Sequence, residues 1–139
     1  MTEARIDWSR AHAPTLDDIE LLARDAFARL PAAFRAMTGD ILFMVTDFPD
    51  EEVVAEMELE SPYDILGLYA GVDLTRASHA DLPLAPNAIF LYRMPILDVW
   101  LDGEESLGHL ITHVLVHEIG HHFGLSDDDM DRIEQGAGG

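Results

Sequence analysis

The sequence predicts a single α+β domain over residues 1–139, with a small mixed sheet packed on one long helix and flexible ends at 1–14 and 136–139. Two observations support this fold class. Apolar residues recur at helical spacing in several segments, and short apolar runs of strand length lie between those segments. A chain of 139 residues can bury roughly two thirds of its unfolded surface around one core, so no second domain is needed.

The N-terminal part is expected to contain two helices with a strand between them. Thr15 and Asp18 form a capping-box pattern ahead of apolar residues at helical spacing, which predicts a helix that Pro31 bends or restarts. The apolar run 41–45 indicates a buried strand, because turn-forming residues follow it directly. The acidic segment 50–58 then predicts a short helix.

Two more strands are expected in the middle of the chain, at 66–69 and 88–93. The polar stretch between them contains Pro83 and Pro86 and is expected to be a loop. Pro95 is expected to end the second strand.

The longest helical pattern runs from about 105 to 123, and a short acidic helix is expected from 127 to about 135. Gly124 lies between them, where a residue able to adopt positive φ would let the chain reverse direction.

The composition of the chain indicates which partners it can bind and which atoms can hold a metal. A formal net charge of −19 disfavours nucleic acid and anionic membrane surfaces, and it favours cations or basic peptides. Cysteine is absent, so any metal must be held by nitrogen and oxygen atoms. No apolar segment approaches the ~20 residues of a membrane-spanning helix, and the N-terminus shows no secretion signal, so a cytoplasmic location is expected.

Five of the seven histidines fall between positions 109 and 122, within the predicted long helix. At about 100° per residue, His117 and His121 lie about 40° apart on one face and one turn apart along the axis. Both rings can therefore reach one metal ion. The spacing H-E-x-x-H on a helix is the metalloprotease pattern, in which two histidines bind zinc and the intervening glutamate is the general base.

Glu118 falls within an apolar stripe of the same helix. A charged carboxylate in that position would cost several kcal/mol if it had no partner. The sequence therefore predicts a compensating cation or hydrogen-bonding group beside Glu118.

The residues from His117 to Asp127 resemble the extended H-E-x-x-H-x-x-G-x-x-D signature of metzincin-type peptidases. Over most of its length the chain resembles a family of small bacterial zincin-like metallopeptidases. This resemblance implies a zincin-like fold, a Zn²⁺ cofactor, and Asp127 as the third metal ligand beside His117 and His121. The methionine-bearing turn of true metzincins lies well downstream of the motif, whereas Met130 lies in a predicted helix and is expected to be a packing residue.

The third ligand has alternatives. Asp127 follows Ser126 at the start of the predicted last helix, where acids are also favoured by the helix dipole. Asp131 and Glu134 are the alternative ligands. His113 and His121 are two turns apart, ~12 Å along the axis, so both cannot bind one ion, and His113 is expected to lie in the core or to support the site.

The remaining candidates carry weaker signals. His109 and His122 point elsewhere on the helix and are expected to be solvated or structural. Tyr69, Tyr92 and Arg93 are expected to be core or edge-strand residues, with a lesser chance that one of them stabilises an oxyanion.

Taken together, these patterns predict a zinc metallopeptidase that hydrolyses peptide bonds with a metal-activated water and with Glu118 as general base. By analogy with zincins, the strand at 88–93, if it is the sheet edge, could hold an extended and preferably basic peptide or protein substrate. The alternative is a non-catalytic zinc-binding interaction or regulatory domain, in which zinc fastens the C-terminal segment to the long helix. A third reading is an acidic helical binding protein whose motif is accidental.

Overall fold

The computed structural model describes residues 6–71 and 87–136. The predicted loop with Pro83 and Pro86 lies outside these residues, as do the outermost parts of the two ends that were expected to be flexible. In chain order the described elements are η1 (Trp8–Arg10), α1 (Leu16–Arg29), α2 (Ala32–Thr38), β1 (Ile41–Thr46), α3 (Glu51–Glu56), η2 (Pro62–Asp64), β2 (Gly67–Ala70), β3 (Asn87–Tyr92), α4 (Arg93–Asp102), α5 (Leu107–His122) and α6 (Asp127–Gly136).

Local signals placed most of these elements correctly. Thr15 caps α1 with a full capping box, in which its hydroxyl accepts a hydrogen bond from the Asp18 backbone N–H and Asp18 accepts one from the Thr15 N–H. Pro31 separates α1 from α2 and is the N-cap residue of α2. The expectation for Pro95 was wrong, because β3 ends at Tyr92 and Pro95 lies in the first turn of α4.

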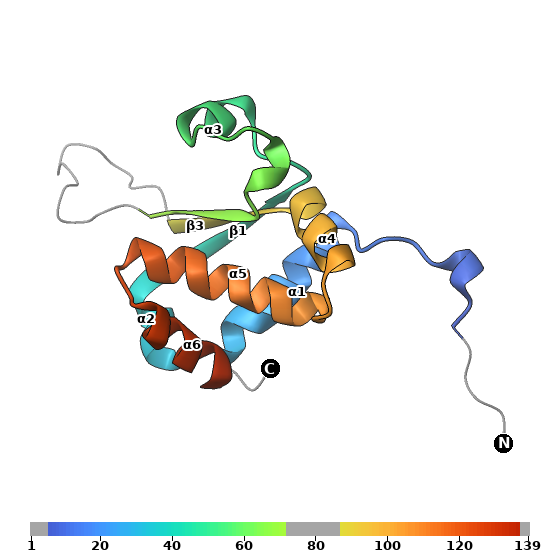
Figure 1. Ribbon diagram of the computed structural model, residues 1–139. Helices are drawn as coiled ribbons and strands as arrows, with labels where there is room; N and C mark the ends of the chain where they lie inside the picture. Colours follow the sequence, from blue (N-terminus) through green and yellow to red (C-terminus); the bar gives the residue numbers. More distant parts are fainter. Residues whose placement is uncertain (1–5, 72–86, 137–139) are drawn as a thin grey trace, which may run out of the picture.

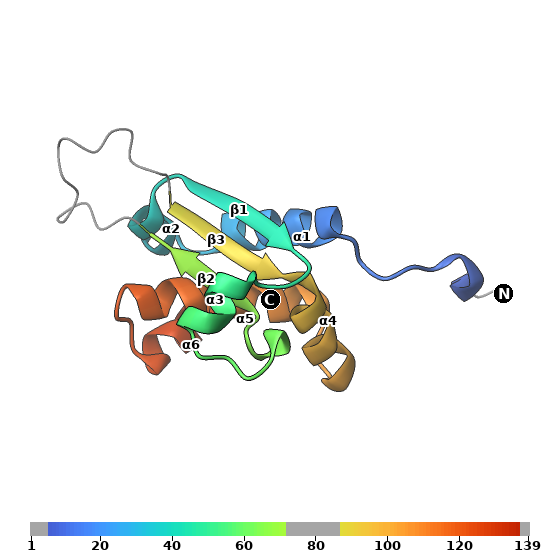
Figure 2. The ribbon, with the colours of Figure 1, turned by 90° about the horizontal axis from the view of Figure 1, so that it is seen from above.

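The sheet has the strand order β1-β3-β2. β1 runs parallel to β3, with Phe43 opposite Ile89, whereas β2 runs antiparallel to β3, with Tyr69 opposite Ile89. Figure 2 shows β3 between its two neighbours. The strand at 88–93 is therefore not at the sheet edge where analogy placed it: among the described strands β3 is central, and β2 lies at an edge.

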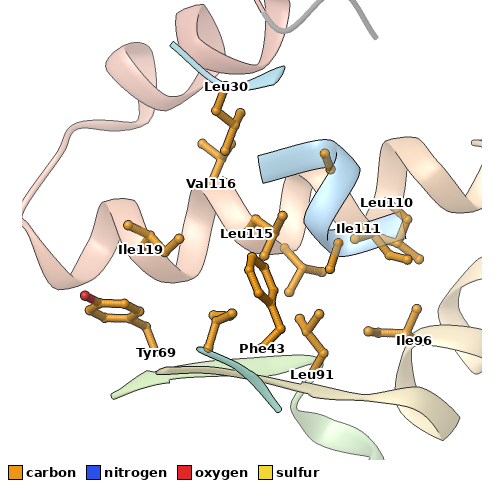
Figure 3. Packing of buried hydrophobic residues seen from close by; sticks show 14 of the residues in the cluster. Leu30, Phe43, Tyr69, Leu91, Ile96, Leu110, Ile111, Leu115, Val116 and Ile119 are labelled. Atoms are coloured by element: carbon orange, nitrogen blue, oxygen red, sulfur yellow. The ribbon is translucent and has the colours of Figure 1, made fainter. Parts of the chain in front are cut away.

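The helices α1 and α5 cover one face of the sheet, and α3 lies on the opposite side (Figure 1). Ile89 and Leu91 of β3 are fully buried on the covered face, and Leu115 of α5 packs toward Phe43 of β1 (Figure 3). On its other side, α5 directs Val116 toward Leu30 at the end of α1 (Figure 3). The long helix thus packs against both the sheet and α1, and the predicted α+β fold with a helix beneath a small mixed sheet is confirmed.

Arg93 joins the start of α4 to two distant segments. Its Nε donates a 2.6 Å hydrogen bond to the carbonyl of Pro14, and its Nη1 lies 3.2 Å from a carboxylate oxygen of Asp47. The Arg93 side chain therefore anchors the segment that leads into α1. Residues 6–13 extend away from the body of the molecule (Figure 2).

Candidate metal centre

His113, His117 and His121 of α5 form a row along one side of the helix. Ser106 caps the helix by accepting a hydrogen bond from the His109 backbone N–H, and Ile111, Leu115 and Ile119 fix the rotation of the helix because they are fully buried. The rings of His113 and His117 have centroids 3.9 Å apart, and those of His117 and His121 are 5.6 Å apart.

The helix α6 lies across the end of this row because of two glycines. Gly124 has a φ of +75° and lets the chain turn after α5. Gly120 faces Met130 of α6, and a Cβ at Gly120 would lie only 2.5 Å from the Met130 sulfur. Met130 is fully buried, which confirms its expected packing role. The absent side chain at Gly120 thus allows α6 to approach the histidine row closely.

This approach brings Glu134 of α6 to two of the histidines. Its Oε1 lies 2.7 Å from His113 Nδ1, and its Oε2 lies 3.9 Å from His117 Nε2. One donor atom from each of His113, His117 and Glu134 lies within 4.8 Å of the other two. We call these three residues the junction cluster, because they join α5 to α6. Within the described part of the chain, no other trio of His, Asp or Glu side chains meets this distance.

The junction cluster leaves buried polar atoms without hydrogen bonds. His117 Nε2 and Glu134 Oε1 are buried, and neither has a hydrogen-bond partner within the described residues, although Glu134 Oε1 lies close to His113 Nδ1. Buried polar groups normally have partners, because an unpaired one costs about 1–3 kcal/mol. Two imidazole nitrogens and a carboxylate oxygen facing a common point are donors of the kind that hold zinc. These residues therefore fit a divalent metal ion.

The sequence-predicted ligands occupy different positions relative to this cluster. We call His117, His121 and Asp127 the motif set. His117 belongs to both groups, whereas His121 and Asp127 are exposed side chains outside the junction cluster. Of the two alternative third ligands, Glu134 lies at the cluster and Asp131 is exposed.

The environment of His117 lowers the pKa of its ring. Burial lowers the pKa of His117, and the neighbouring rings of His113 and His121 lower it further, whereas the carboxylates of Glu134 and Asp127 act in the opposite direction. A neutral imidazole is the form that binds a metal. A carboxylate of the junction cluster, Glu134, and one of the motif set, Asp127, thus both raise the pKa of His117.

Glu118 is partly buried, as its place in the apolar stripe predicted. Burial raises the pKa of the Glu118 carboxyl, and the nearby His121 lowers it to a lesser extent. A carboxylate with a raised pKa is a stronger base than an exposed one, which suits the transfer of a proton near neutral pH.

His113 was expected in the core or in a supporting position, and the structure contradicts the core position, because the His113 side chain is exposed and contacts Glu134. His113 is too far from His121 to share an ion with it. His113 and His117, however, have the same one-turn spacing as the motif histidines. That spacing was the signal that could have found the junction cluster.

The other candidate residues contact neighbouring side chains or lie in the core. His109 Nδ1 lies 2.9 Å from Glu105, and the exposed His122 packs edge-on against Tyr69 with centroids 4.7 Å apart. Tyr69 and Tyr92 are buried, as expected of core residues.

A family model described as a zincin-like metallopeptidase matches residues 38–137. The matched region runs from the end of α2 through α6 and includes every residue of the motif set and of the junction cluster. No curated protein matches the chain. Among the described residues, no helix combines the length and apolar character needed to cross a membrane.

Proposed function

The chain belongs to the zincin-like metallopeptidase family, and from this premise we propose that it is a zinc-dependent peptidase with Glu118 as the general base. In this proposal His117, His121 and Asp127 hold the metal. The observation that carries the proposal is the position of Glu118, a partly buried carboxylate with a raised pKa between two histidines one helical turn apart.

The metal and Glu118 of α5 would have separate roles in hydrolysis. Zinc, when bound, supplies the Lewis acidity that activates water for attack on a peptide carbonyl. Glu118 accepts the proton that the attacking water loses and delivers it to the departing amine. The donor atoms of His117, His121 and Asp127 do not all lie within 4.8 Å of one another, so these side chains must move toward a common point to hold one ion.

A peptide substrate would bind along the edge strand β2. This strand contacts α5, and among the described strands it pairs only with β3. An extended peptide can add to such an edge through backbone hydrogen bonds. The net charge of −19 favours basic peptides. Cleavage of a peptide library at low and high salt tests this preference, which should weaken as salt is added.

The change that tests the general base is Glu118→Gln, which keeps the shape of the side chain and removes its basicity. We expect peptide hydrolysis to fall by about 10²–10⁴-fold while zinc binding, measured by metal analysis, is retained. Glu105→Gln is the matched control, because Glu105 precedes the same helix and pairs with His109. A Glu118→Gln variant with wild-type activity would rule out Glu118 as the base.

A non-catalytic zinc-binding domain is the second candidate function. The contact between His113 and Glu134 favours it, because it already links α5 to α6 at a place where a metal would fasten the two helices. Wild-type protein that binds zinc but cleaves no peptide in a diverse library would support this candidate over the peptidase.

A further inference from the structure

We propose that the junction cluster is a second metal position, and that it competes with the motif set for the shared ligand His117. The proposal concerns where a divalent ion binds, so it does not depend on whether the chain cleaves peptides.

The distances within the junction cluster are those of donors around an ion. Zinc holds its ligands at about 2.0–2.1 Å in a tetrahedron, which places two donor atoms about 3.3–3.5 Å apart. The contacts of Glu134 with His113 and His117, at 2.7 and 3.9 Å, lie on either side of that separation. Small side-chain adjustments would therefore complete the site.

The polar atoms of the cluster also lack alternative partners. Within the described residues, His117 Nε2 and Glu134 Oε1 are buried without a hydrogen bond. A bound cation would satisfy both atoms, and three protein ligands would leave a fourth position for water. A surface hollow of about 470 Å³, lined by His109, Asp131, Glu134 and Gln135, gives an ion access to Glu134.

The sharing of His117 makes the two positions exclusive. The ring of His117 lies between those of His113 and His121, one helical turn from each. When it binds an ion together with His113 and Glu134, it is withdrawn from the motif set. An ion in the junction cluster is then not held by the motif set, which lies beside Glu118. If the proposed function is correct, zinc held by Glu134 is in a position that does not support hydrolysis.

The test uses the full chain with the motif set disabled, as the double variant His121→Gln, Asp127→Asn. Both replaced side chains are exposed, so the fold should survive, and circular dichroism checks this. Zinc binding is measured by competition with a chromophoric chelator, and Co²⁺ absorption reports the coordination. We expect one Zn²⁺ per chain to remain bound.

Adding Glu134→Gln to the double variant should weaken zinc binding by about 100-fold or more, because loss of even a supporting partner of a ligand costs 10–100-fold. Asp128→Asn is the matched control, since it removes an exposed acid from the same helix that belongs to neither group of ligands, and it should change the affinity less than about threefold. If the double variant is unfolded, the same comparison is made in the single variant Asp127→Asn, where the same dependence on Glu134 is expected.

Two results would overturn the proposal: a folded double variant that binds no zinc, or zinc binding that is insensitive to Glu134→Gln. A different result would show that the peptidase proposal is wrong. In that case wild-type protein is inactive on peptides while the double variant still takes up zinc through Glu134.

Discussion

Replacing Gly120 by alanine tests whether the close packing of α6 on α5 depends on the missing side chain. A Cβ at this position would lie 2.5 Å from the sulfur and 2.9 Å from Cγ of Met130, which is fully buried. Overpacking of this kind costs about 1–3 kcal/mol. Alanine also improves helix propensity over glycine by about 1 kcal/mol. Subtracting the gain from the cost, we expect a net loss of up to about 2 kcal/mol in the free energy of unfolding.

Denaturant unfolding of the metal-free protein, followed by circular dichroism, measures this loss, and the melting temperature should fall by up to roughly 10 °C. Gly108→Ala is the matched control. Gly108 lies in the same helix, and a Cβ there would have no neighbour within 4 Å, so that variant should be as stable as wild type or gain up to about 1 kcal/mol. If Gly120→Ala is as stabilising as Gly108→Ala, the packing argument is refuted.

Two further predictions concern the N-terminal half. Hydrogen bonds from Thr15 lower the pKa of the Asp18 carboxyl, so its contribution to stability is present above the unfolded pKa and is lost as pH falls through the lowered one. Asp18→Ala should therefore be less stable than Asp17→Ala at neutral pH, and thermal melts should show this difference disappearing in strong acid. Arg93→Met removes the hydrogen bond to Pro14 and the ion pair with Asp47, so limited proteolysis should cut before α1 faster than in wild type. An unchanged cleavage rate would show that Arg93 does not hold this segment.

The sequence predicted those elements whose signals are local. The capping box at Thr15, the restart at Pro31 and the turn at Gly124 depend on neighbouring residues, and all three are present in the structure. The helix α4 was missed because Pro95 was interpreted as a terminator. Pro95 instead lies in the first turn, where backbone N–H groups have no partner within the helix and a proline costs little.

Non-local features were harder to predict. The strand order depends on pairing between distant segments, so the central position of β3 was not visible in its own sequence. The candidate site could be predicted only in part for the same reason. One-turn spacing marks His117 as a candidate ligand, but the meeting of Glu134 with His113 depends on how α6 packs over Gly120.

The order of the strands has a consequence for folding. The middle strand of the sheet, β3, is also the last of the three along the chain, so β1 and β2 have no shared partner until residues 87–92 have been synthesised. Until then, a ribosome-bound chain carries two unpaired apolar segments that can associate with other molecules. Formation of the sheet then recruits both segments in one step, and a chain that stops short of β3 should aggregate rather than fold.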